Sequence, residues 1–152
     1  MAREIERKFL VDPKGAEVKA ILAGPGTRIR QGYIASSARG VVRVRIKGET
    51  GLLTVKGATE GFSRDEFEYE IPLADAEAML SGLCGKIVDK TRWTHPLPCG
   101  HTLELDVFAD IDLALAEVEM DREDAQVDLP DWLGREVSTD PAYFHNTIAE
   151  RL

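Results

Sequence analysis

The sequence is poor in cysteine and has no long apolar run. Its two cysteines, Cys84 and Cys99, do not form a CxxC pair, so we expect reduced thiols rather than a disulfide framework. No stretch approaches the ~20 apolar residues that a membrane-spanning helix requires. Charges at positions 3, 4, 6, 7 and 8 leave no apolar core for a signal peptide. The sequence therefore predicts a soluble, cytoplasmic protein without a membrane partner.

Acidic residues outnumber basic residues, and common sequence motifs of hydrolases are missing. The net charge of −8 leaves no excess of basic side chains for a nucleic-acid surface. There is no GxxxxGK[ST] loop, which argues against a P-loop phosphatase, and no spacing indicates a Ser-His-Asp or Cys-His nucleophile. The three histidines are interpreted as structural or solvent-exposed, namely His95, His101 and His145.

The dominant feature of the sequence is period-two alternation, which is typical of strands. Turn sequences such as "KGETG" and "PLPCG" separate the alternating segments. The expected strands are 3–11, 28–36, 41–48, 51–57, 63–73, 86–95, 101–109 and 113–120. Apolar residues at helical spacing predict helices over 12–24 and 73–82, and Asp140 is the expected N-cap of a third helix that closes the chain.

Eight strands joined mostly by short turns indicate one antiparallel sheet, which can close into a barrel and so remove its edges. The predicted fold class is α+β. We expect a single domain over residues 1–152, an eight-stranded antiparallel β-barrel with helices packed on the outside and a C-terminal helix.

Charged side chains share one face of these strands, and aliphatic side chains occupy the other. The charged face comprises Glu4, Glu6, Lys8, Arg43, Arg45, Lys47, Lys56, Arg64, Glu66, Glu68, Glu70, Lys90, Arg92, Glu104, Asp106, Glu117 and Glu119. One interpretation is a solvated face above an aliphatic core. However, the signs are segregated by strand, and the helices need the aliphatic face to pack on. A closed sheet would then turn its charges inward around water, because unpaired buried charges cost several kcal/mol each.

The charge types on this face indicate a ligand. Carboxylates at i and i+2 on adjacent strands form an oxygen site suited to Mg²⁺ or Mn²⁺. Arginine and lysine match phosphate oxygens, and arginine can bind two at once. We therefore expect a chain of phosphates with its divalent metal, in which Glu4 and Glu6 hold metal and Lys8 meets phosphate.

The motif E-x-E-x-K in "EIERKFLV" is followed in order by "RVRIKG", "LLTVKG", "RDEFEYEI", "KTRW", "LELDVF" and "AEVEM". In this series the chain resembles the CYTH superfamily, the triphosphate tunnel metalloenzymes, over essentially its whole length. The resemblance implies an eight-stranded antiparallel tunnel that binds triphosphate with Mg²⁺ or Mn²⁺.

The resemblance also implies residue roles. Metal ligands would be Glu4, Glu6, Glu117 and Glu119, and phosphate would be held by Arg43, Arg45, Lys56, Arg64, Lys90 and Arg92. Lys8 would lie beside the scissile end, and Tyr33 would assist proton transfer or else pack at the end of its strand. Metal binding and pairing with basic neighbours both remain open for Glu66, Glu68, Glu104 and Asp106. Lys47 is either part of the set or solvated, and Arg135 would lie in a loop near the tunnel mouth.

The leading functional prediction is a metal-dependent triphosphatase that cleaves the terminal phosphate of tripolyphosphate. Thiamine triphosphate and nucleoside triphosphates remain possible substrates. An adenylate cyclase is disfavoured, because no extra segment is present to hold adenine, and a non-catalytic polyphosphate sensor is the alternative from another class. We expect a small-molecule partner, no nucleic acid, and a monomer or homodimer.

Overall fold

The computed structural model describes residues 2–151, and for residues 2, 99 and 146 it describes the backbone alone. The elements in chain order are β1 (Ala2–Val11), α1 (Ala16–Leu22), β2 (Thr27–Ser37), β3 (Gly40–Lys47), β4 (Thr50–Gly57), β5 (Ser63–Ile71), α2 (Leu73–Gly82), β6 (Val88–Pro96), η1 (Pro98–Gly100), β7 (Thr102–Phe108), β8 (Ala114–Glu119), β9 (Leu133–Glu136), η2 (Pro141–Tyr143) and α3 (His145–Glu150).

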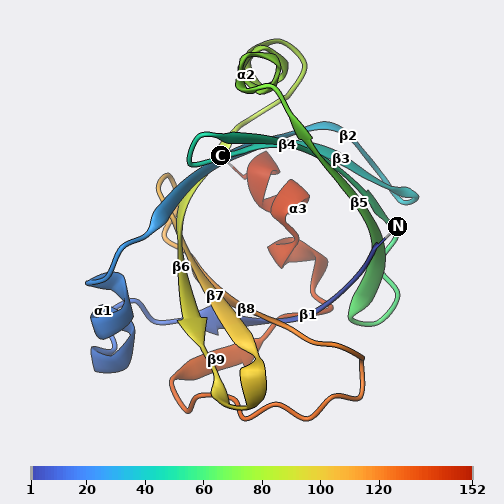
Figure 1. Cartoon of the computed structure of the whole chain (residues 1–152). Coiled ribbons are helices and arrows are strands. Elements are labelled where there is room, and N and C mark those ends of the chain that lie inside the picture. The colour runs from blue at the N-terminus through green and yellow to red at the C-terminus, as the bar shows by residue number, and fades with distance from the viewer. Residues whose placement is uncertain (1, 152) are drawn as a thin grey trace.

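Eight antiparallel strands close into a barrel, as the alternation predicted (Figure 1). The strand order is β5-β4-β3-β2-β6-β7-β8-β1, and β1 closes the ring by pairing with β5. The first half of β1 pairs with β5, where Glu4 lies opposite Arg64. Its second half pairs with β8, where Glu6 lies opposite Glu119 and Lys8 opposite Glu117. The first and last barrel strands are therefore neighbours, as closure of the sheet requires.

The structure differs from the sequence prediction in one strand and in the starts of two helices: β9 was not predicted, α1 begins later, and Asp140 caps η2 rather than α3, which begins at His145. A ninth strand, β9, pairs with β1 at Phe9 and Val11; its four residues "LGRE" are too short and polar to show alternation. The first helix begins only at Ala16, because residues 12–15 form a turn in which Gly15 N–H donates to the carbonyl of Asp12 at 3.2 Å.

Helices α1 and α2 cover the outside of the barrel, as expected (Figure 1). Val18 of α1 is buried in one cluster with Phe9, Leu103 and other residues of the outward strand faces. Ala76 and Leu80 of α2 pack in another with Val44 and Ile46 of β3. The aliphatic face of the sheet is therefore an outer core, which leaves the charged face to line the interior.

The C-terminal helix lies within the barrel outline rather than outside it (Figure 1). Ile148 of α3 is buried against Val88, Phe108 and Leu115. These three residues continue the inward-facing rows of β6, β7 and β8. The assumption that every helix packs on the outer face is thus wrong for α3. The inner face becomes apolar at this end of the barrel, so it offers α3 a surface on which to bury its own apolar side.

Two remaining expectations concern cysteine and membrane spans. Cys84 is a free thiol, as expected, and the expectation for Cys99 falls outside the described side chains. Among residues 2–151, no helix has the length and hydrophobicity needed to cross a bilayer.

We predict that Ile148→Ala destabilises the protein by about 2–5 kcal/mol, because the side chain is fully buried and truncation leaves a cavity. The measurement is urea-induced unfolding. Leu83→Ala is the control, since Leu83 is 61% exposed, and its effect should stay within about 0.5 kcal/mol. A loss as small as that of the control would contradict the buried position of α3.

Candidate active site

Charged side chains from the inner faces of the strands gather around a cavity in the bore. Its lining comprises Glu4, Glu6, Arg43, Arg45, Lys47, Lys56, Glu66, Glu68, Arg92, Thr102, Glu104, Glu117, Glu119 and His145. The cavity volume is about 340 Å³, which is enough space for several waters or a small ligand. The charged face is therefore turned inward around space for water or ligand, as predicted.

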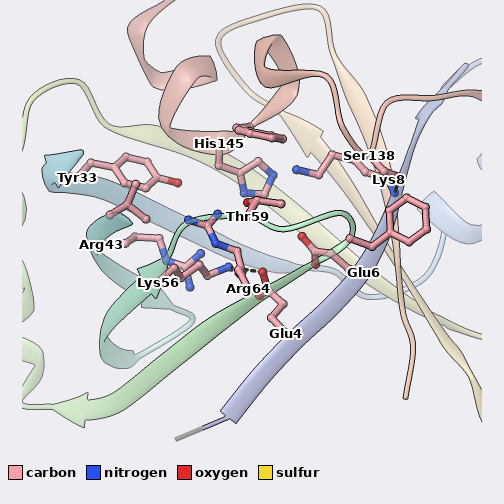
Figure 2. A pocket seen from close by; sticks show the side chains of 13 residues that line it. Glu4, Glu6, Lys8, Tyr33, Arg43, Lys56, Thr59, Arg64, Ser138 and His145 are labelled. Carbon is pink, nitrogen blue, oxygen red and sulfur yellow. Dashed lines mark hydrogen bonds and ion pairs between the residues drawn. The ribbon is translucent and has the colours of Figure 1, made fainter. Parts of the chain in front are cut away.

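A second cavity continues this space toward the end of the barrel that α3 occupies (Figure 2). The two cavities share the lining residues Glu4, Glu6, Arg43, Lys56 and His145. The second cavity adds Lys8, Tyr33, Val41, Thr59, Phe62, Arg64, Ser138 and Phe144. The predicted E-x-E-x-K residues therefore face one continuous space together with the predicted tyrosine.

Three buried arginines form the basic wall of the bore. Arg43, Arg45 and Arg92 are 4%, 7% and 7% exposed. Arg43 donates from Nη2 to Thr54 Oγ1 at 3.3 Å and Glu68 Oε2 at 3.5 Å, but its buried Nε has no hydrogen-bond partner among the side chains that the structure describes. A buried donor without a partner costs about 1–3 kcal/mol. An anion in the cavity would relieve that cost.

The buried pair of Lys90 and Asp106 anchors this wall. Lys90 Nζ lies 2.6 Å from Asp106 Oδ2, and Arg92 binds both oxygens of the same carboxylate at 2.7 and 2.8 Å. Burial alone would raise the pKa of Asp106, but Lys90 and Arg92 outweigh it and hold this pKa well below its usual value. Burial lowers the pKa of Lys90 to about 7 despite the pull of Asp106.

Two lysines lie at the cavity surface. Lys56 contacts carboxylates of β1 and β5, and Lys8 contacts the C-terminal segment. Lys56 Nζ lies 2.7 Å from Glu4 Oε2 and 3.4 Å from Glu66 Oε2. Lys8 is 8% exposed, donates from Nζ to the carbonyl of Tyr143 at 3.1 Å, and lies 5.7 Å from the centroid of the Phe144 ring. Both ammonium groups are thus held at the cavity surface.

Carboxylates crowd around Glu6, and Lys8 and Lys56 compensate only part of their charge. Burial, then the neighbouring carboxylates of Glu117 and Glu4, raise the pKa of Glu6 well above its usual value. Burial and Glu104 likewise raise the pKa of Glu119. Glu117 Oε1 is buried, and its contact with His145 Nε2 at 3.1 Å does not meet the geometry of a hydrogen bond. A cation would relieve this crowding, so the predicted metal ligands Glu4, Glu6, Glu117 and Glu119 fit an oxygen-ligated divalent ion.

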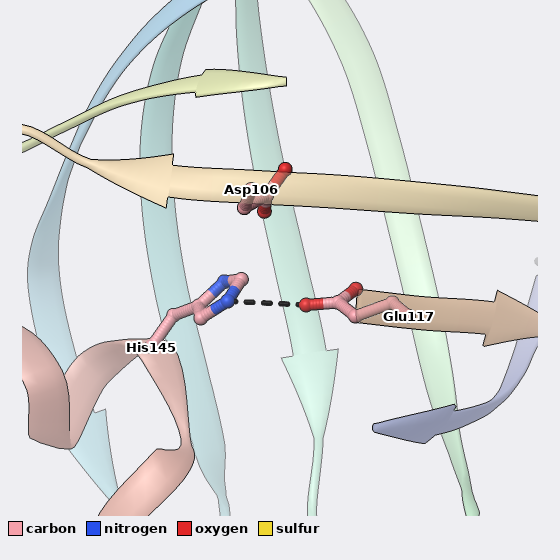
Figure 3. Close-up of side chains that lie close together, drawn as sticks. All are labelled: Asp106, Glu117 and His145. Atoms are coloured by element: carbon pink, nitrogen blue, oxygen red, sulfur yellow. Dashed lines mark ion pairs between the residues drawn. The ribbon is translucent and has the colours of Figure 1, made fainter. Parts of the chain in front are cut away.

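His145 lines both cavities and its side chain is 11% exposed, so the solvent-exposed interpretation of this residue is wrong. It lies on α3, and its Nε2 is 3.1 Å from Glu117 Oε1 (Figure 3). Its Nδ1 lies 3.4 Å from Lys90 Nζ. Burial and Lys90 lower the pKa of His145 well below its usual value, so the imidazole is neutral. The sequence pattern predicted the C-terminal helix on the outside of the barrel, so it did not place His145 in the bore.

Asp106, Glu117 and His145 also form a group with metal-binding atoms, all within 4.8 Å of one another (Figure 3). The chemistry of this group is less favourable for a cation than that around Glu6. Asp106 already holds Lys90 and Arg92, and a cation there would compete with two buried positive charges. The carboxylates around Glu6 are the better fit.

Gln31 is a fully buried residue of the inner face that was not among the residues predicted from the sequence. Its Oε1 accepts from Arg45 Nε at 2.9 Å and from Nη2 at 2.7 Å, and its Nε2 lies 3.1 Å from Tyr33 Oη. Gln31 lies opposite Arg45 in the β2–β3 register. It shares the inner face with Tyr33, so the alternation could have found it. A search restricted to charged side chains passes over it.

The remaining predicted residues lie in ion pairs or at the mouth of the bore. Four carboxylates whose role was left open pair with basic neighbours, namely Glu66 with Lys56, Glu68 with Arg43, and both Glu104 and Asp106 with Arg92. Arg64 donates to the carbonyl of Gly57 at 3.0 Å, and Lys47 is an exposed lining residue. Glu70 is exposed. Arg135 lies on β9, within 4.0 Å of Asp140.

Comparison with known proteins places this arrangement in a family. The CYTH domain profile matches residues 2–151. An inorganic triphosphatase of Acetivibrio thermocellus is 40% identical over 153 aligned residues, covering 99% of this chain and 95% of the relative. An inorganic triphosphatase of Nitrosomonas europaea is 38% identical, covering 96% of each chain.

Solved structures agree with the sequence comparison. The crystal structure of an inorganic triphosphatase, 34% identical, covers 98% of this chain and 95% of its own length with a TM-score of 0.65. A protein of Pyrococcus horikoshii, 20% identical, covers 79% of this chain and 80% of its own, with a TM-score of 0.62. At that identity the second match shows the fold alone.

We predict that Asp106→Asn destabilises the protein by about 3–5 kcal/mol, because it leaves Lys90 and Arg92 buried with an uncompensated charge. The measurement is urea-induced unfolding at several pH values. Since the pKa of Asp106 is lowered in the folded state, its contribution is complete above the ordinary carboxyl pKa and is lost only as pH falls through the folded value.

The control for this variant is Glu77→Gln, which removes the ion pair between Arg30 and a carboxylate that is 50% exposed. It should cost less than about 1 kcal/mol. Equal effects of the two substitutions would contradict the anchoring role of Asp106.

Proposed function

The chain belongs to the CYTH domain family, and from this premise we propose that it is an inorganic triphosphatase. It hydrolyses the terminal phosphoanhydride bond of tripolyphosphate inside the charged bore. Water attacks the terminal phosphorus, the bond to the bridging oxygen breaks, and phosphate and pyrophosphate are released. The inorganic triphosphatases that resemble this chain over nearly its whole length support the proposal.

One observation of the site carries the proposal. The buried arginines 43, 45 and 92 line the same cavity as the carboxylates of Glu4 and Glu6, and Arg43 Nε has no partner among the described side chains. Such a wall suits a ligand that is itself highly anionic, because guanidinium groups can bind phosphate oxygens in pairs.

The residues of the chain would act by positioning and by charge stabilisation, since phosphoryl transfer needs little covalent chemistry from a protein. Arg43, Arg45 and Arg92 bind the phosphate oxygens and stabilise charge that spreads over the transferred group. Lys56 and Arg64 extend the basic surface along the second cavity. Lys8 lies beside the scissile end, and Tyr33 donates a hydrogen bond from Oη to a phosphate oxygen.

A divalent metal is part of the proposal. Glu4, Glu6, Glu117 and Glu119 would hold Mg²⁺ or Mn²⁺. Burial and the carboxylates of Glu117 and Glu4 raise the pKa of Glu6 despite Lys8 and Lys56, which supports a place for a cation there. When bound, the ion neutralises phosphate oxygens and makes the attacking water more acidic. Glu66, Glu68 and Asp106 are secondary candidates, since they already hold basic partners.

We predict phosphate release from tripolyphosphate with Mg²⁺ or Mn²⁺ and none with EDTA. The assay compares tripolyphosphate, ATP and thiamine triphosphate by phosphate detection, with chromatography for nucleotide products. Binding of tripolyphosphate without release would favour a sensor, and cyclic AMP from ATP would favour a cyclase. Either result would overturn the proposed function.

Glu4→Gln should reduce metal-dependent turnover by at least about 100-fold, comparable to the loss of one charge-stabilising group from an active site. Glu77→Gln on α2 removes the same charge from an exposed helix position and should retain full turnover. Unfolding curves of both variants separate lost chemistry from lost structure. Wild-type turnover in Glu4→Gln would contradict the assignment of this carboxylate.

The metal site predicts a stability effect that does not depend on turnover. Glu6→Gln should raise the Tm in EDTA by about a few degrees, because it removes a carboxylate crowded by Glu117 and Glu4. Mn²⁺ should raise the Tm of the wild type, since it binds only the folded state, and should raise that of the variant much less. Differential scanning calorimetry measures both, and equal Mn²⁺ shifts would refute the site.

A further inference from the structure

We propose that Gln31 is a positioning residue of the site. Its side-chain amide holds Arg45 toward the phosphate chain and fixes the direction in which Tyr33 presents its hydroxyl proton. The inference deepens the proposed triphosphatase function and rests on it. Gln31 carries no charge and lines neither cavity, so it acts through these two neighbours rather than on the substrate.

The strand register brings the three residues together. In the pairing of β2 with β3, Gln31 lies opposite Arg45 and Tyr33 lies opposite Arg43. Gln31 and Tyr33 are two residues apart on β2, so their side chains share the inner face. Gln31 is fully buried, and Arg45 is 7% exposed. Their contacts are therefore shielded from water. Hydrogen bonds are stronger in such a buried environment, and their loss there is more costly.

The orientation of the amide follows from the chemistry of arginine. A guanidinium group has donors and no acceptor, so both contacts from Arg45, at 2.9 and 2.7 Å, require the oxygen of Gln31. The nitrogen of the amide must then face Tyr33 Oη at 3.1 Å. An amide nitrogen donates and does not accept. The Tyr33 oxygen therefore accepts a hydrogen bond from Gln31, and its own proton is free to point elsewhere.

The hydroxyl group of Tyr33 can point its proton into the cavity. Tyr33 lines the cavity that also contains Lys8, Arg43 and His145 (Figure 2). By accepting from Gln31, the hydroxyl is held as a donor toward the space where the phosphate chain would lie. A donor fixed in advance stabilises charge that increases during the reaction, because it needs no reorientation at that moment.

The same amide leaves the charge of Arg45 available to an anion. Arg92 is held by the carboxylates of Asp106 and Glu104, whereas the hydrogen-bond acceptor of Arg45 is the neutral oxygen of Gln31. A neutral acceptor satisfies two buried donors without cancelling the positive charge. Arg45 therefore keeps both its geometry and its attraction for phosphate.

Gln31→Glu tests both roles with an isosteric side chain. A carboxylate still accepts from Arg45, but it neutralises this arginine and cannot donate to Tyr33, whose hydroxyl would turn to donate to it. We expect kcat for tripolyphosphate to fall at least about tenfold, to or below the level of Tyr33→Phe, and KM to rise. In the Tyr33→Phe background the same substitution should still raise KM, but it should lower kcat by a smaller factor than in the wild type, because only the effect on Arg45 remains.

Gln31→Met provides a second test that adds no charge. It removes both the donor to Tyr33 and the acceptor of Arg45, so its kcat loss should become smaller in the Tyr33→Phe background, where only the effect on Arg45 remains. Gln126→Glu is the matched control, because it makes the same charge change in an exposed loop, and it should retain wild-type kcat and KM.

Two outcomes would overturn the positioning role while the wild type hydrolyses tripolyphosphate. One is wild-type kcat in Gln31→Glu or Gln31→Met. The other is kcat losses that multiply with that of Tyr33→Phe, as expected of a general structural defect. A wild type that releases no phosphate in the same assay would instead refute the proposed function, so the two failures are distinguishable.

Discussion

An ionised side chain enclosed by a sheet needs a counter-charge, water or a ligand, because bare burial costs several kcal/mol. This constraint organises the bore. Lys90 and Asp106 are both fully buried and lie 2.6 Å apart, and Arg92 binds the same carboxylate. Such pairs neutralise part of the charge that lines the bore. What remains unpaired, above all Arg43 Nε and the crowded carboxylate of Glu6, indicates where phosphate and metal would be accommodated.

The bore changes character along its length, and α3 depends on that change. At one end the inner rows become apolar at Val88, Phe108 and Leu115, and Ile148 is buried among them. The same short helix brings His145 beside Glu117. The C-terminal segment thus closes one end of the barrel and contributes to the site. One small barrel can therefore contain both a charged cavity and the apolar contact between α3 and the inner face of the sheet.

Much of the fold and of the charged lining could be predicted, because a strand places alternate side chains on opposite faces. The predictions missed features that this two-residue period does not identify. The strand β9 is too short for alternation to register. His145 lies on a helix whose side of the sheet no local pattern specifies. Gln31 obeys the alternation, but a neutral amide does not stand out in a search for charge.

The sequence by itself determined which side chains share a face, since this depends only on the two-residue period of the backbone. It also determined that the face combines carboxylates with arginine and lysine, the chemistry of metal and phosphate. Only the tertiary structure decided which charges neutralise one another and which stay available, because those distances depend on register across strands far apart in the chain. Lys90 meets Asp106 across β6 and β7, and Arg45 meets a neutral glutamine across β2 and β3.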